Sequence, residues 1–344
     1  MFYLWRRMGE EDRGRVWRLY GWFTALMTCG SCFGAVARTA QMMFTVNYFR
    51  ASVSSSINSN EHFVALAYSW LPSFVVTYAV EFLCMCAAKL MVLDRMATFA
   101  APEDPRLQTR WAAAGRVVMA AVVLGNAVGL AANVAAAVHY QEAANAKGAA
   151  SAYFAMNSTK LGTQFKTLGR EEMARAGSIE SVQFICEVAV LLLIVVAFVV
   201  VGLLCARILR SRFKPGGVDA GYDAFMATVG SKLRLQMAGT TALVFVTFLL
   251  RAVFSTMQLV AWLWRDIEKQ CAGVFSGCDA SCYNVYQHIS TWMLYTPEFQ
   301  QVIILISSPL AQLAALWSMT PTAALQLNRS SRQDTALSLS PLQP

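Results

Sequence analysis

Five ionisable side chains lie inside long apolar stretches of this chain, where a charge is costly. They are Arg38, Glu81, Glu187, Arg251 and Glu298. A charged side chain near the centre of a membrane helix costs roughly 2.5 kcal/mol or more unless it is paired or hydrated. We therefore expect all five to face the interior of a helix bundle or a wet cavity. Such residues can pair with one another, bind a ligand or an ion, or pass a proton along.

Six apolar stretches surround these residues, and each is long enough to cross a membrane. They cover residues 19–44, 63–91, 117–138, 182–206, 237–264 and 291–319. A transmembrane helix needs about 20 apolar residues, and a helix satisfies its own backbone hydrogen bonds in lipid. The composition agrees, with 57% hydrophobic and 14% charged residues. The sequence predicts an all-α fold, a polytopic transmembrane helix bundle of six spans.

The distribution of basic residues predicts the orientation of the bundle. Arginine and lysine concentrate before the first span, between the second and third, and between the fourth and fifth. These segments and both termini are therefore expected in the cytosol. We predict a basic amphipathic segment over residues 1–18, the bundle over 19–319 and a disordered tail over 320–344. The net charge of +8 follows from this distribution and does not indicate a nucleic-acid partner.

The segments expected on the outer side carry features of the secretory pathway. Asn157 begins an N-glycosylation sequon, and the segment between the fifth and sixth spans contains Cys271, Cys278 and Cys282. In an oxidising compartment, one disulfide among these cysteines is favoured over a zinc site that includes His288. The spacing of the three cysteines does not determine which two form the disulfide. The predicted location is a plasma membrane or a vacuolar or endolysosomal membrane.

The depth of each charged residue can be counted at about 1.5 Å per residue from the predicted helix ends. Arg38, Glu187, Arg251 and Glu298 fall in one layer toward the outer side, whereas Glu81 falls deeper. The matched depths of Arg251 and Glu298 predict a buried ion pair that fixes helix register. The alternatives are a polar cavity open to the outside, which binds a ligand or an ion, and a pathway across the membrane through Glu81.

Other polar features of the spans are interpreted as packing devices. Gly125 and Gly129 form a G-x-x-x-G pattern that permits close helix approach, and Asn126 and Asn133 can bond across helices. All three histidines fall at the outer face, where chance placement is favoured over a pH sensor or a metal site. The chain contains no P-loop, H-E-x-x-H or G-x-S-x-G pattern. We predict no enzymatic activity, no cofactor and no metal.

Several short motifs carry a resemblance to a known family. They are Tyr20 to Thr24 followed by Arg38 on the first span, Leu71-Pro72 with Thr77-Tyr78 on the second, and Phe248 to Arg251 on the fifth. With these motifs the chain resembles the tobamovirus multiplication proteins of plants, which are seven-helix, receptor-like proteins of vacuolar and related endomembranes. The resemblance implies that the six spans correspond to the second to seventh helices of that family. The chain departs from it at residues 87–89 and in the cysteine-containing outer segment.

These observations predict a multi-pass membrane protein that acts as a non-enzymatic receptor or scaffold. Its expected partners are the lipid bilayer, a small-molecule ligand at the outer face and a cytosolic protein. The alternative function is transport of a small solute or an ion through the intramembrane charges. A receptor predicts a closed cytosolic half with a polar outer cavity, whereas a transporter predicts a polar track through Glu81.

Overall fold

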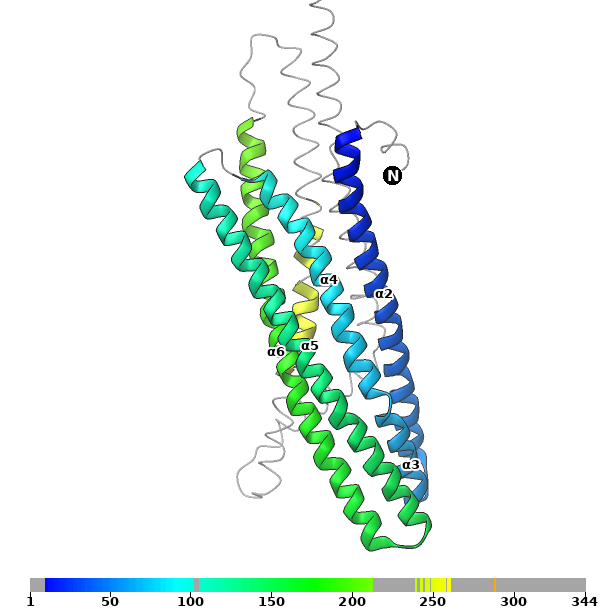
Figure 1. Cartoon of the computed structure of the whole chain (residues 1–344). Helices are drawn as coiled ribbons and strands as arrows, with labels where there is room; N and C mark the ends of the chain where they lie inside the picture. The colour runs from blue at the N-terminus through cyan, green and yellow to red at the C-terminus, as the bar shows by residue number, and fades with distance from the viewer. Residues whose placement is uncertain are drawn as a thin grey trace, which may run out of the picture.

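The computed structural model describes residues 10–101, 105–212, most of 239–260 and residue 288. The described chain is helical and contains no strand in these ranges. The long helices are α2 (Glu10–Val53), α4 (Leu71–Phe99), α5 (Pro105–Ala155) and α6 (Thr159–Arg212), and α3 (Ile57–Tyr68) is short. A further apolar helix covers Phe245–Met257. Figure 1 shows the long helices side by side in one elongated bundle.

Three helical segments of the described chain are long and apolar enough to cross a membrane. They are Ile57–Thr98, Pro105–Ala155 and Thr159–Ile208, and they contain the second, third and fourth predicted spans. α2 contains the first predicted span and is less apolar overall than α4. The helix Phe245–Met257 lies within the fifth, and residues 291–319 lie outside the described residues. The predicted count of six spans therefore stays a prediction.

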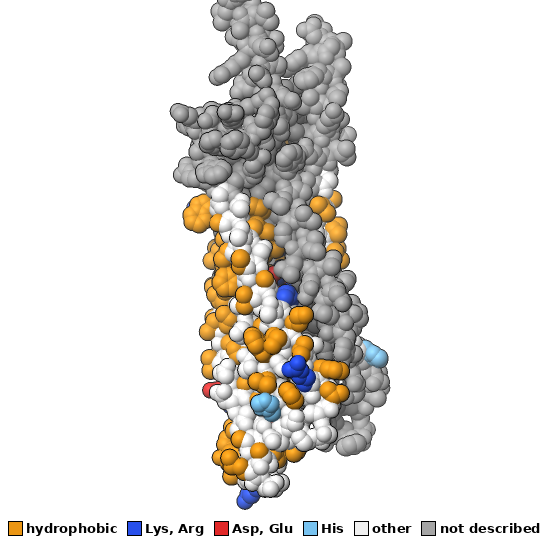
Figure 2. Space-filling view, turned by 90° about the vertical axis from the view of Figure 1, so that its right-hand side faces the viewer, with side chains coloured by type: hydrophobic (Ala, Val, Ile, Leu, Met, Phe, Trp, Pro, Cys, Tyr) orange, Lys and Arg blue, Asp and Glu red, His pale blue; other side chains and the backbone are white. Residues whose placement is uncertain are grey.

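Exposed apolar side chains cover the predicted spans. Trp22 and Met42 on α2 are each 66% exposed, and Val117, Leu124 and Val196 on α5 and α6 are also exposed. Figure 2 shows apolar side chains along the height of the described surface on the α2 and α3 side, with few charged ones. A water-soluble surface rarely carries such continuous apolar cover. The surface is compatible with helices that face lipid.

The helices α5 and α6 continue well past the predicted spans. With the turn at residues 156–158 they form residues 139–181, which we call the outer hairpin and which lie between the third and fourth predicted spans. Alanine is frequent between residues 143 and 155 and has the highest helix propensity, which explains the extended helix. The tight turn at the tip has Asn157 at a φ of 58°, a conformation that asparagine adopts more readily than most residues.

The remaining helix boundaries follow from local chemistry. Ser56 caps α3 by accepting a hydrogen bond from the backbone nitrogen of Ser59 at 3.1 Å. The second predicted span is interrupted at Ser69 and Trp70, and α4 restarts with Pro72 in its first turn, where proline is tolerated. α2 covers Glu10–Val53 and continues without a break past residue 18, and residues 1–9 of the predicted amphipathic segment lie outside the described residues.

Close packing sets the helix order that positions the site. α5 runs along α6, α2 runs along α4, and α3 packs against α5. A Cβ atom added to Gly34 on α2 would lie 2.9 Å from the carboxyl carbon of Glu81 on α4, and one added to Gly125 on α5 would lie 2.6 Å from Val190 on α6. Asn133 donates a hydrogen bond to the carbonyl of Val75 at 2.9 Å. These small and amide residues bring the backbones together.

Candidate functional site

Glu187 on α6 is the centre of a buried polar cluster. Its side chain is 0% exposed. The carboxylate accepts hydrogen bonds from Tyr78 Oη at 2.9 and 3.0 Å, from Ser255 Oγ at 2.9 Å and from Arg251 Nε at 3.4 Å. These partners come from α4 and from the helix Phe245–Met257. One carboxylate therefore joins three helical segments and is neutralised by one guanidinium.

A second ion pair lies beside the first and joins α2 to α4. Arg38 Nη2 lies 3.8 Å from Glu81 Oε2, and Arg38 Nη1 donates to Gln41 Oε1 at 2.9 Å. Both charged side chains are buried. The Tyr78 ring connects the two pairs, since the guanidinium carbon of Arg38 lies 5.7 Å from its centroid and that of Arg251 lies 6.0 Å away. Both distances permit cation–π attraction.

We call this set the charge network. Its members are Arg38, Tyr78, Glu81, Glu187, Arg251 and Ser255, and all are nearly or fully buried. Two formal positive and two formal negative charges balance within it. Within the described chain, both terminal nitrogens of Arg251 lack a hydrogen bond, although the Phe82 ring centroid lies 4.9 Å from its guanidinium carbon. Within the described residues, the hydrogen bonding of the network is therefore incomplete, and buried polar groups that lack a partner are energetically costly.

The geometry differs from the sequence-based interpretation at Glu81, and the predicted pairing of Arg251 with Glu298 stays a prediction. Glu81, which the depth count placed apart, lies beside Arg38 because α2 and α4 approach closely at Gly34. Arg251 contacts Glu187, whereas its predicted partner Glu298 lies outside the described residues. The sequence-based interpretation did not include Tyr78 and Ser255 among the candidate site residues. Tyr78 lies three residues before Glu81 and therefore on the same helix face, which is a signal that the sequence did contain.

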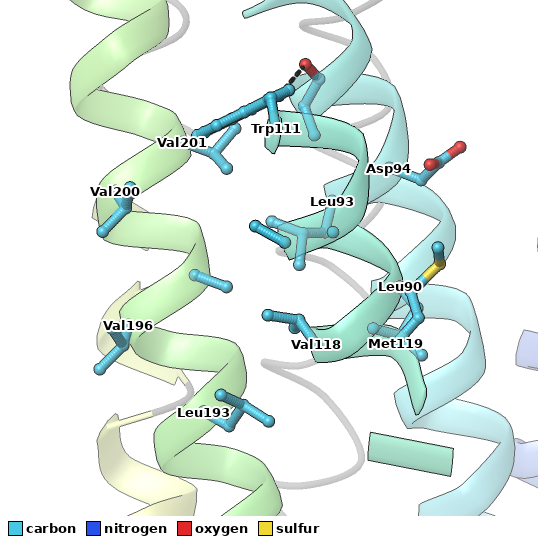
Figure 3. Close-up of a pocket in the computed structure, with 14 residues that line it drawn as sticks. Leu90, Leu93, Asp94, Trp111, Val118, Met119, Leu193, Val196, Val200 and Val201 are labelled. Atoms are coloured by element: carbon cyan, nitrogen blue, oxygen red, sulfur yellow. Dashed lines mark hydrogen bonds between the residues drawn. The ribbon is translucent and has the colours of Figure 1, made fainter. Parts of the chain in front are cut away.

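An apolar pocket of about 230 Å³ opens between α4, α5 and α6. Its wall includes Leu90 and Leu93 from α4, Val118 from α5 and Leu193 and Val196 from α6. Figure 3 shows Val118 and Leu193 pointing toward one another between the ribbons of α5 and α6. The pocket lies closer to the predicted cytosolic side than the charge network does, and none of the network residues lines it.

Two polar groups border the pocket. Trp111 donates from its indole nitrogen to the carbonyl of Ala97 at 2.9 Å, which fixes the ring across one end. Asp94 also borders the pocket, and its carboxylate points away from the other labelled side chains in Figure 3. Tryptophan commonly lies at the membrane–water interface. This end of the pocket is therefore expected near the cytosolic surface of the bilayer.

An ion triad stabilises the outer end of the bundle. Glu61 on α3 contacts Lys147 on α5 at 2.8 Å and Lys166 on α6 at 2.6 Å. Both lysines belong to the outer hairpin, well beyond the predicted spans. Burial raises the pKa of Glu61, but hydrogen bonds from the two lysines outweigh this effect and hold its pKa below the ordinary 4.5. The triad holds α3 onto the hairpin and is structural in character.

The predicted glycosylation site and the cysteines predicted to form a disulfide lie in two different parts of the chain. Asn157 is exposed in the turn at the tip of the outer hairpin, where an oligosaccharide has room. Cys271, Cys278 and Cys282 lie outside the described residues. Among the described cysteines, all six are free thiols.

The chain matches no protein-family model, no curated protein and no solved structure. The likeness to the tobamovirus multiplication proteins therefore rests on the short motifs alone.

Proposed function

We propose that this protein is a non-enzymatic, receptor-like membrane protein in which an apolar ligand occupies the pocket between α4, α5 and α6. The observation that carries the proposal is that the pocket and the charge network share α4 and α6. Glu187 belongs to the network and Leu193 to the pocket, and six residues of helix separate them by about 9 Å. A ligand that moves α6 at the pocket also acts on the ion pair of Glu187.

The chemistry of the pocket favours one end of an acyl chain or a similar hydrophobic group. The walls are almost entirely aliphatic, and the volume is below the roughly 300 Å³ of a site for a drug-sized ligand. A polar cavity at the outer face that binds a ligand was one of the alternatives predicted from the sequence. The pocket lies on the predicted cytosolic side of the network, and we place the apolar ligand there, whereas a ligand at the outer face stays a prediction.

The charge network supports a switching role over a transport role. Its groups are buried between helices, and within the described chain both terminal nitrogens of Arg251 have no hydrogen-bond partner, which suits an element that has two arrangements. Transport of a small solute or an ion is the competing function, because Lys89, 1% exposed, extends the buried charge along α4. Transport requires water to reach these groups in turn from both sides. We also propose a secretory-pathway membrane location and a cytosolic protein partner.

Filling the pocket tests the ligand site. Gly115 lines the pocket, and a Cβ atom there would meet nothing within 4 Å. Gly115→Met should therefore occupy ligand space without a clash. If the new side chain displaces about two methylene groups of the ligand from the pocket, at about 0.8 kcal/mol each, the ligand should bind about tenfold more weakly. The measurement is saturable photolabelling of the detergent-solubilised protein by a diazirine-bearing palmitic acid, with unlabelled palmitic acid as competitor.

A matched variant separates pocket filling from helix stabilisation. Gly21 on α2 also has open space around a Cβ atom and does not line the pocket, so Gly21→Met should label as the wild type does. Both variants should gain about 0.5–1 kcal/mol of helix stability. Equal labelling of Gly115→Met and the wild type would refute the ligand site. Labelling without a change in hydrogen exchange at residues 183–190 would refute the coupling to Glu187.

Glycosylation tests the orientation of the bundle. If the outer hairpin faces the lumen, Asn157 should carry an N-linked glycan when the chain is expressed in a glycosylating eukaryotic cell. An endoglycosidase should then increase the electrophoretic mobility of the wild type and leave Asn157→Gln unchanged. A second sequon at Asn328 falls on the predicted cytosolic side and serves as an internal comparison. A glycan on Asn328 with none on Asn157 would reverse the orientation.

A further inference from the structure

Three side chains with metal-binding groups meet on the outer hairpin, close to the membrane end. His139 and Glu142 lie on α5, and Glu172 lies on α6. His139 Nδ1 is 2.8 Å from Glu172 Oε2 and 3.4 Å from Glu142 Oε2. All three ligand atoms lie within 4.8 Å of one another. Neither the charge network nor the apolar pocket uses these residues.

The helices hold this arrangement in place. Residues 139 and 142 are three apart, so they share one face of α5, and α6 packs along that helix. The other oxygen of Glu172, Oε1, accepts a hydrogen bond from Arg175 Nη1 at 2.9 Å. This bond orients the carboxylate and leaves Oε2 directed at His139, which is the role that outer-shell partners have in metal sites.

We propose that His139, Glu142 and Glu172 bind one Zn²⁺ ion from the outer compartment. Zinc binds imidazole nitrogen and carboxylate oxygen at about 2.0–2.2 Å with tetrahedral geometry, so its ligand atoms lie about 3.4 Å apart. The observed separations reach that value by small rotations of the side chains. The histidine disfavours Mg²⁺ and Ca²⁺, which take oxygen ligands. Glu142 is 54% exposed in its side chain, so water completes the fourth position.

The bound ion replaces the proton between His139 and Glu172 and joins α5 to α6 where the two helices leave the membrane. It therefore braces the outer hairpin against the spans. This role is independent of the apolar ligand proposed above, because the zinc site and the pocket lie on opposite sides of the charge network.

The experiment is a titration of zinc into the full chain in detergent, in which isothermal titration calorimetry measures the binding. The thiols are first alkylated, because Cys271, Cys278 and Cys282 could bind zinc by themselves. We expect one ion per chain, with nitrogen and oxygen ligands in the X-ray absorption spectrum. His139→Asn and Glu142→Gln should each raise the dissociation constant at least about tenfold.

The control is Glu171→Gln, which removes an exposed carboxylate from the same turn of α6 and lies outside the cluster. It should bind zinc as the wild type does. Zinc binding that survives both His139→Asn and Glu142→Gln unchanged, or an absence of binding to the alkylated wild type, would overturn the proposal. Because the side chain of Glu142 is exposed, Glu142→Gln should leave the hairpin folded.

Discussion

Replacing Arg251 by methionine is expected to destabilise the folded protein by about 3–5 kcal/mol, because Glu187 then stays buried without its cation. Glu187→Gln should cost a similar amount, since it leaves the guanidinium unpaired. The double variant should recover much of the loss, because no unpaired charge is left. The measurement is a double-mutant cycle on unfolding in detergent. Additive losses would show that the two side chains are not partners.

The same cycle can be run with Glu298, the partner that the depth count predicts for Arg251. If Arg251 couples energetically with Glu187 and not with Glu298, then Glu187 is the partner of Arg251, in agreement with the described contact. Coupling with both would mean that Glu298 also reaches the guanidinium, whose terminal nitrogens have no hydrogen bond within the described chain. Ser255→Ala is a useful comparison, because it removes one hydrogen bond to Glu187 and no charge. It should cost roughly 1–3 kcal/mol.

Breaking the ion triad should have the second largest effect. Lys147→Met is expected to cost about 3 kcal/mol or more, because Lys147 is almost fully buried against Glu61. Lys166 is 26% exposed in its side chain, so Lys166→Met should cost only about 1 kcal/mol or less. Both can be measured by denaturant unfolding, with the wild type and each variant at pH 7. Equal costs would contradict the difference in burial.

The triad also predicts a loss of stability in acid. The folded pKa of Glu61 is below its ordinary 4.5, so its contribution is present above about pH 4.5. That contribution is lost as the pH falls through the lower folded pKa. The stability difference between the wild type and Glu61→Gln should therefore shrink on acidification. A difference that stays constant down to pH 2 would show that Glu61 is not held in its ionised form by the lysines.

Many elements of the bundle could be predicted from the sequence because they depend on local composition. The stretches 63–91, 117–138 and 182–206 are apolar enough for lipid, and the described helices cover them apart from the short break at residues 69 and 70. The same reasoning identified Arg38, Glu81, Glu187 and Arg251, since a charge among apolar residues is visible without any structure. The lengths of the helices were harder to predict from the sequence. The alanine-rich outer hairpin was treated as a connection because it is too polar for lipid, although alanine makes it a good helix in water.

The amino-acid sequence by itself determined which residues are apolar and where charge enters the apolar stretches. It also predicted an approximate depth for each charge along its helix, although Glu81 lies beside Arg38 and not deeper, as the depth count predicted. Depth is one coordinate. The tertiary structure decided the other two, which are the lateral order of the helices and the rotation of each about its axis. Those depend on contacts between distant residues, such as Gly34 against Glu81. For that reason the partner of Arg251, the place of Tyr78 in the network and the meeting of His139 with Glu172 emerge only once α2, α4, α5 and α6 are packed together.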